Sequence, residues 1–325
     1  MIDHKGSRFN IAVPLEGDVL LYNTATGALL RVDPDTHEAL APLFQDGSRG
    51  VPRDWAPPVP EDLDEDLAGA LTEGGFVVAR EVDELGVLRS AFERERTSPD
   101  LKFTIGLTMA CNFACPYCFE EHRNEHMSMA AADATFTFIQ AQMRAAQATS
   151  VYVNWFGGEP LLNLDVLCHL SRRLRDEAAA TGAYYESLVI TNGALLTRAV
   201  AEQLRAAGVE AAQVTLDGPA AVHDQRRPFK GGQGSFDRIL ANLRETTDVL
   251  RTIVRVNVDQ GNHASQRELV RVLADAKLLD GPHAARIYAG KVTAYTEQSE
   301  MLWTPLDQRA IGTIAEPIAA ELGAL

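Results

Sequence analysis

The chain has 325 residues, of which 46% are hydrophobic and 23% are charged, as is typical of a globular protein with a large core. Its formal net charge of −15 argues against nucleic-acid binding, which needs a basic surface. No apolar run approaches the ~20 residues of a membrane helix, and no signal-peptide segment follows Met1. These features predict a cytoplasmic protein that does not bind nucleic acid or membrane.

Residues 1–95 are predicted to form a small N-terminal domain that combines strands and helices. Apolar runs at 9–14 and 19–22, separated by Glu16-Gly17-Asp18, indicate a β-hairpin. The other elements predicted in this part are a strand at 28–32, helices at 37–44 and 63–72, a closing strand at 76–78 and a helical connector at 81–97. The proline-rich stretch 51–60 cannot continue a helix.

Residues 96–292 show a different pattern, in which strands and helices alternate. The predicted strands are 101–108, 150–156, 186–191, 211–216, 252–258 and 284–289. The predicted helices are 130–147, 162–180, 197–206, 236–250 and 265–276. Six such repeats predict an α/β fold, a partial (β/α)6 barrel with a parallel sheet and right-handed crossovers. Residues 293–325 are predicted to form a C-terminal helical segment.

Three of the four cysteines follow the first predicted barrel strand, with the spacing C-x3-C-x2-C at Cys111, Cys115 and Cys118. Three thiolates on one loop can hold three irons of a [4Fe–4S] cluster and leave the fourth iron open, because full protein ligation takes four cysteines. The alternative is structural zinc, since His122 extends the run to four soft ligands. Cys168 lies in a predicted helix and is most simply a buried small side chain.

The cysteine motif, with Tyr117 directly before the third cysteine, resembles the signature of the radical S-adenosylmethionine (SAM) enzymes. The resemblance implies that SAM binds the open iron and that a low-potential electron donor reduces the cluster. It also implies that the resulting 5′-deoxyadenosyl radical removes a hydrogen atom from the substrate. Cys111, Cys115 and Cys118 would then be the metal ligands, in the partial barrel typical of the family.

Later strand ends carry further matches to this family. Gly157, Gly158 and Glu159 resemble its Gly-Gly-Glu motif, which binds the SAM amino group. The alternative is a tight turn before a helix, where Glu159 would be favoured by the helix dipole. The Thr-Asn-Gly run that begins at Thr191 is a weaker match.

The run 213–219 followed by 223–227 is similar to one in the peptide- and sulfatase-maturing (SPASM-type) branch. By that resemblance Thr215 would bind the methionine or ribose part of SAM. Arg227, or alternatively Arg226, would pair with its carboxylate, since a guanidinium fork suits a carboxylate. Val258 would pack on the adenine, and Tyr117 would help to position SAM.

The run LLYNTATGALLRVD at 20–33 and the element order of residues 1–95 resemble the small winged-helix (PqqD-like) peptide-recognition domain of ribosomal-peptide-modifying enzymes. A simple N-terminal cap on the barrel is the alternative. The branch commonly carries further cluster cysteines in a C-terminal domain, whereas no cysteine follows Cys168 here, which predicts either a single cluster or a truncated chain.

The sequence as a whole predicts a radical SAM oxidoreductase that modifies a peptide or protein substrate, in the manner of a ribosomal-peptide (RiPP) maturase. Two alternatives stay open. One is a non-catalytic zinc or Fe–S protein that binds a peptide, and the other is a radical SAM enzyme that acts on a small molecule.

Overall fold

The structure is a computed structural model that describes residues 3–15, 17–44, 54–60 and 62–291. The predicted C-terminal helical segment at 293–325 lies outside the described residues. The chain divides into two compact units, residues 1–97 and 98–325. Among the described residues, none of the helices has the length and apolar composition that crossing a membrane requires.

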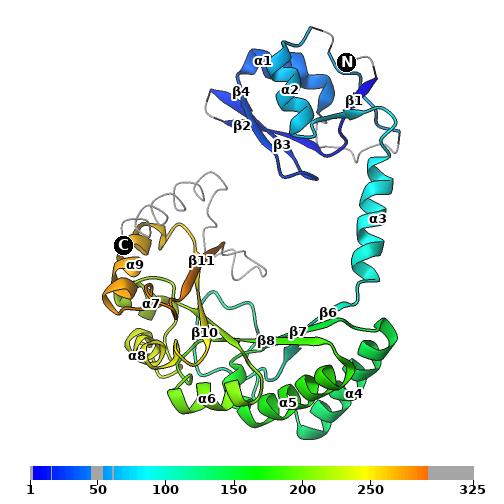
Figure 1. The fold of residues 1–325 in the computed structure, drawn as a ribbon. Helices are drawn as coiled ribbons and strands as arrows, with labels where there is room; N and C mark the ends of the chain where they lie inside the picture. The colour runs from blue at the N-terminus through cyan, green and yellow to red at the C-terminus, as the bar shows by residue number, and fades with distance from the viewer. Residues whose placement is uncertain (1–2, 16, 45–53, 61, 292–325) are drawn as a thin grey trace. The chain divides into compact units, whose positions relative to one another are not determined.

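The first unit confirms the predicted small N-terminal domain of strands and helices (Figure 1). Its strands form an antiparallel sheet in the order β2-β3-β4 and a separate antiparallel pair, β1 with β5. The elements are β1 (His4–Gly6), β2 (Asn10–Leu15), β3 (Asp18–Asn23), β4 (Leu29–Val32), α1 (Pro34–Leu40), η1 (Ala41–Leu43), α2 (Glu65–Glu73), β5 (Val77–Ala79) and α3 (Glu84–Arg96).

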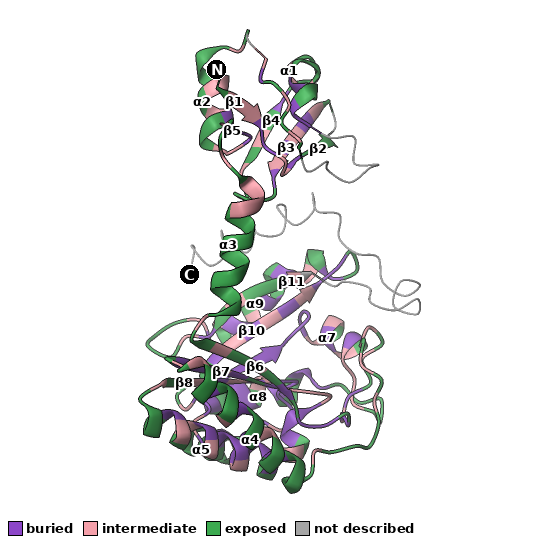
Figure 2. Ribbon diagram, turned by 90° about the vertical axis from the view of Figure 1, so that its right-hand side faces the viewer, coloured by how far each residue is buried: buried purple, intermediate pink, exposed green. Residues whose placement is uncertain are grey.

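Burial alternates along the strands of this first unit, as expected for a sheet that packs on one face. Val19 and Leu21 on β3 point into a core that also contains Leu40, Leu71 and Phe76. Asp33 and Asp64 begin helices α1 and α2 by accepting backbone N–H groups of the first turn. Helix α3 has no buried residue and is green along most of its length in Figure 2.

The second unit contains the predicted six-stranded parallel sheet, in the order β11-β10-β9-β8-β7-β6. The sheet curves, and helices α4, α5, α6 and α8 lie along its convex side (Figure 1). Its strands are β6 (Asp100–Gly106), β7 (Ser150–Phe156), β8 (Tyr184–Thr191), β9 (Ala211–Thr215), β10 (Arg251–Val258) and β11 (Arg286–Lys291). The partial-barrel prediction is therefore confirmed.

Six α-helices accompany this sheet in the described residues: α4 (Met129–Ala146), α5 (Leu164–Thr181), α6 (Arg198–Ala206), α7 (Ala220–Arg226), α8 (Phe236–Thr246) and α9 (Gln266–Asp275). Two short 3-10 helices, η2 (Pro160–Asn163) and η3 (His263–Ser265), precede α5 and α9. The sequence did not predict α7, because seven residues are too few to show helical periodicity.

The two faces of the sheet differ in character, and this difference positions the site. Side chains such as Val153 and Trp155 are at most 1% exposed and pack in the core beneath the helices. Alternate side chains, such as Phe156, Gln213 and Arg255, line a cavity on the concave face. Functional groups at the carboxyl ends of the strands therefore face this open concave side.

Candidate active site

The cysteine loop leaves the carboxyl end of β6, and its three thiols line one cavity. Cys111 is 9% exposed, whereas Cys115 and Cys118 are half-buried. The cavity contains about 1020 Å3 of space including its open mouth, and Phe113 and Phe119 add apolar walls. Burial raises the pKa of all three thiols, so the loop without metal keeps them protonated.

The Gly157-Gly158 turn after β7 lies directly against the start of the cysteine loop. The Gly158 N–H donates to the Thr108 carbonyl at 2.9 Å, and a Cβ on Gly157 would lie 2.3 Å from the same oxygen. A Cβ on Gly158 would lie 2.3 Å from the Ala110 carbonyl oxygen. Both glycines are therefore required for this close backbone approach, and both also line the cavity.

Glu159 has partners that the sequence did not predict. Its carboxylate accepts hydrogen bonds from the Thr191 hydroxyl at 2.7 Å, the Asn192 N–H at 2.8 Å and the Leu161 N–H at 3.0 Å. The side chain is fully buried and does not line the cavity. The carboxylate thus joins the β7 and β8 strand ends, and it does not need a ligand ammonium to satisfy it.

Asn192 continues this connection to the first cysteine. Its side-chain amide donates to Asn112 Oδ1 at 2.7 Å and lies 3.9 Å from Cys111 Sγ, which also accepts the Phe113 N–H at 3.4 Å. Donors around a sulfur stabilise its thiolate and tune a bound cluster. The Thr-Asn-Gly run was noted in the sequence, but this role of Asn192 was not predicted.

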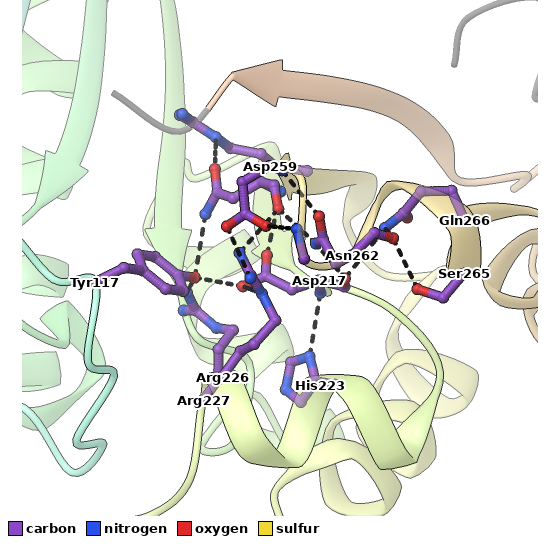
Figure 3. A network of polar contacts seen from close by, with 12 residues as sticks. Tyr117, Asp217, His223, Arg226, Arg227, Asp259, Asn262, Ser265 and Gln266 are labelled. Carbon is purple, nitrogen blue, oxygen red and sulfur yellow. Dashed lines mark hydrogen bonds and ion pairs between the residues drawn. The ribbon is translucent and has the colours of Figure 1, made fainter. Parts of the chain in front are cut away.

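Tyr117 links the cysteine loop to the ends of β9 and β10 (Figure 3). Its hydroxyl donates to Asp217 Oδ2 at 2.6 Å and accepts hydrogen bonds from Arg227 Nη1 and from Asn257 Nδ2. Arg227 Nε is buried and has no hydrogen-bond partner among the described residues. A ligand carboxylate in the cavity would supply the acceptor that this guanidinium lacks.

Arg226, which the sequence could not separate from Arg227, forms a buried ion-pair network (Figure 3). Its Nη1 lies 2.8 Å from Asp259 Oδ2, and its Nε lies 3.4 Å from Asp217 Oδ2. All three side chains are at most 6% exposed. With two carboxylates already beside it, Arg226 stabilises the fold, and Arg227 is the arginine that lines the cavity.

His223 on α7 connects the same network to the start of α8. Its Nδ1 accepts the Asp217 N–H at 3.2 Å, so the ring proton lies on Nε2, which donates to Ser235 Oγ at 3.1 Å. Ser235 Oγ in turn donates to the Arg227 carbonyl at 2.6 Å. Burial, together with the charges of Arg227 and Arg226, holds the pKa of His223 well below its ordinary value, so the ring is neutral.

Thr215 and Val258 lie on opposite sides of the sheet. Thr215, at the end of β9, lines the cavity. Val258, at the end of β10, is 2% exposed and belongs to the core beneath the helices, as Val254 and Val256 do. The predicted contact between Val258 and adenine does not follow from this arrangement, because the β10 side chains on the cavity side are Arg255 and Asn257.

The donor set around the cavity fits a [4Fe–4S] cluster with SAM on its open iron. Three free cysteines share the wall, and the unpartnered Arg227 Nε offers a carboxylate site. Among the described residues, no three His, Cys, Asp or Glu side chains lie close enough to share one metal ion, although His122 Nε2 is 3.6 Å from Cys118 Sγ. The alternative zinc site is therefore not preformed here.

The model of the Radical SAM superfamily matches residues 105–273, just over half of the chain, and the chain belongs to this superfamily. The protein is therefore an enzyme of the class that uses a [4Fe–4S] cluster and SAM. The matched residues run from β6 into α9 and include all three clustered cysteines.

Curated relatives share the core and differ in the reactions that they are named for. The AdoMet-dependent heme synthase of Methanosarcina barkeri is 34% identical over 141 residues, which are 42% of this chain and 36% of the relative. The GTP 3′,8-cyclase of Mycobacterium sp. strain KMS is 30% identical over 168 residues, which are 50% of this chain and 43% of the relative. The matched part thus spans less than half of these relatives.

Solved structures show the same fold at low sequence identity. Streptococcus suis SuiB, crystallised with its precursor peptide SuiA, matches with a TM-score of 0.53 at 14% identity, over 99% of this chain and 70% of SuiB. The enzyme anSMEcpe with bound AdoMet matches with a TM-score of 0.50 at 16% identity, over 59% of this chain and 50% of its own. These similarities establish the fold.

Proposed function

We propose that this protein is a radical SAM enzyme that removes a hydrogen atom from a peptide or protein substrate. The observation that carries the proposal is the convergence of Cys111, Cys115 and Cys118 with Gly158, Thr215 and Arg227 on one cavity at the strand ends. When bound, the reduced cluster and SAM supply the 5′-deoxyadenosyl radical, and the protein positions and shields the reacting groups.

Each residue of the cavity has a defined task in this proposal. The three thiolates would hold three irons. The backbone at Gly157 and Gly158 lines the cavity beside the cysteine loop and would receive the SAM amino group, while Arg227 would receive the carboxylate. The Thr215 hydroxyl, which has no hydrogen-bond partner in the described part of the chain, would contact the methionine or ribose portion.

The peptide part of the proposal is supported by the N-terminal unit. Residues on one face of its three-stranded sheet are apolar yet exposed: Leu29 is 62%, Ile11 45% and Val13 36% exposed. Ile11 pairs with Tyr22, which pairs with Leu29, so the three side chains form one row across the sheet. Strands β2 and β4 are its edges, and an extended peptide can add to such an edge while its side chains cover the apolar face.

Peptide binding is tested with the full-length chain and short peptides encoded beside its gene, followed by fluorescence anisotropy. Leu29→Glu is expected to weaken binding at least about tenfold, which corresponds to about 1.4 kcal/mol. Leu88→Glu is the matched control, because Leu88 is also exposed, at 52%, but lies on α3. Equal binding by the wild type and both variants would contradict the peptide role of this face and leave the radical chemistry untouched.

Radical chemistry on a small molecule is the second candidate, because the curated relatives are named as heme synthases and GTP cyclases. Absence of any peptide binding by the wild-type chain would favour it. Either reaction needs a low-potential electron donor, and the proposed compartment is the cytoplasm, where thiols stay reduced.

A further inference from the structure

Arg255 is a charged residue of the cavity wall that the proposed function leaves without a task. It lies on β10, directly beside Thr215 on β9 and Tyr288 on β11. Its side chain is half-buried and lines the same cavity as the three cysteines. It therefore lies beside the residue proposed to contact SAM, where a substrate group must approach.

Neighbouring side chains hold the Arg255 guanidinium in place. Its Nε donates to Asn257 Oδ1 at 2.8 Å, and its central carbon lies 6.0 Å from the centre of the Tyr288 ring. Tyr288 is itself fixed, because its hydroxyl donates to Gln213 Oε1 at 2.8 Å. Gly290 leaves room for the guanidinium, since a Cβ there would lie 3.0 Å from Arg255 Nε. The group is thus oriented before any ligand binds.

No carboxylate among the described residues pairs with Arg255, in contrast to the neighbouring Arg226. Glu120 lines the same cavity, but no ion pair joins it to Arg255. The two terminal nitrogens of Arg255 therefore keep their donors available to a ligand. A planar guanidinium with free donors, in a partly enclosed cavity, is suited to forming two parallel hydrogen bonds with a carboxylate.

We propose that Arg255 binds a substrate carboxylate, supplied by an Asp or Glu side chain of the peptide that enters the cavity. This inference rests on the proposed function and extends it to a substrate class, acidic peptides. Arg227 and Arg255 would then divide two carboxylates between them, the first taking that of SAM and the second that of the substrate.

Chemical footprinting tests the division between the two arginines. The full-length protein with its reconstituted cluster is treated anaerobically with phenylglyoxal, which modifies accessible guanidinium groups, and each arginine is quantified by mass spectrometry. The protein is treated alone, with SAM, and with SAM plus pools of short capped peptides that differ only in a central Glu or Gln. SAM alone is expected to protect Arg227, and the Glu pool is expected to protect Arg255 several-fold better than the Gln pool.

Substitution of the arginine supplies the matching arm of the experiment. The wild type is expected to prefer the Glu pool over the Gln pool by about tenfold in affinity, as is typical of a charge-assisted hydrogen bond. Arg255→Gln should reduce this ratio to about one, Arg255→Lys should restore part of it, and the exposed control Arg244→Gln should leave it unchanged.

Three results would overturn the inference: protection of Arg255 by SAM alone as fully as Arg227, equal binding of the two pools by the wild type, or better protection of Arg255 by inorganic phosphate than by the Glu pool. None of these readouts needs turnover. A wild-type protein that fails to cleave SAM would defeat the proposed function instead, so the two failures can be told apart.

Discussion

The Tyr117 hydroxyl donates a 2.6 Å hydrogen bond to Asp217, a residue 100 positions further along the chain. This contact ties the cysteine loop to the end of β9, where Arg226 and the Asn257 N–H hold the Asp217 carboxylate. The same hydroxyl accepts a hydrogen bond from Arg227 and so lies between that cation and Asp217. The loop that carries the cysteines is thereby coupled to the arginine proposed to bind SAM.

Tyr117→Phe is expected to weaken both the fold and SAM binding. It removes a donor from a buried carboxylate, which costs about 1.5–3 kcal/mol for a charge-assisted bond, and should lower the thermal midpoint of the protein without cofactors by several degrees. SAM affinity, measured calorimetrically on the reconstituted protein, should fall because Arg227 loses the group that orients it. Tyr184→Phe, at an exposed tyrosine of β8, is the control. An unchanged midpoint for Tyr117→Phe would contradict the coupling.

Glu159→Gln is expected to destabilise the protein even when SAM is absent. An amide cannot accept all three hydrogen bonds, so its NH2 group would face the Asn192 N–H or another donor without an acceptor. A buried unsatisfied group costs about 1–3 kcal/mol, which should lower the thermal midpoint of the protein without cofactors. If the variant kept the wild-type midpoint and lost only SAM affinity, Glu159 would be a ligand-binding residue, as its motif suggested.

Gly158→Ala is expected to reduce iron retention. The new Cβ would lie 2.3 Å from the Ala110 carbonyl, which belongs to the backbone directly before Cys111 and cannot yield without moving the loop. Iron and sulfide per chain after anaerobic reconstitution should therefore fall well below the wild-type value. Gly69→Ala is the control, since a Cβ there meets nothing within 4 Å. Full iron content in Gly158→Ala would show that the loop tolerates the displacement.

The neutral His223 predicts a specific pH dependence of stability. Burial lowers its pKa in the folded state, so below about pH 6.5 the unfolded chain takes up a proton that the folded chain does not. Stability should therefore fall as the pH drops, by about 1.4 kcal/mol between pH 7.5 and 5.5, or roughly 3–5 °C in thermal midpoint. His223→Asn keeps an acceptor for the Asp217 N–H without titrating.

The wild type should thus lose several degrees more than His223→Asn over this pH range, while the exposed His263→Asn should follow the wild type. Parallel midpoints for the wild type and His223→Asn at every pH would show that His223 does not titrate on unfolding.

The barrel could be predicted from sequence because each strand carries an apolar run and each helix has a repeating apolar face. The elements that escaped, β1 and α7, have three and seven residues, too few for either period to show. The helix predicted over 236–250 ends at Thr246, where the backbone turns before β10. Local pattern predicts the existence of an element better than its last turn.

The site could be predicted as far as the strand ends, but not in the direction of every side chain. The sequence near Glu159 does not reveal that its partners come from Thr191 and Asn192, more than thirty positions away. For Val258 a signal was present: Val254, Val256 and Val258 alternate with Arg255 and Asn257, and one set must face the helices. Which arginine faced the cavity depended on the turn of α7, which the sequence did not predict.

The most direct test of the account is to measure 5′-deoxyadenosine after anaerobic reconstitution, reduction and addition of SAM. The wild type and Cys168→Ala should both form it, because Cys168 lies on α5 and does not line the cavity of the three clustered cysteines. Cys115→Ala should form none. Product formation by Cys115→Ala at the wild-type level, or its absence in the wild type with a full cluster, would contradict the account.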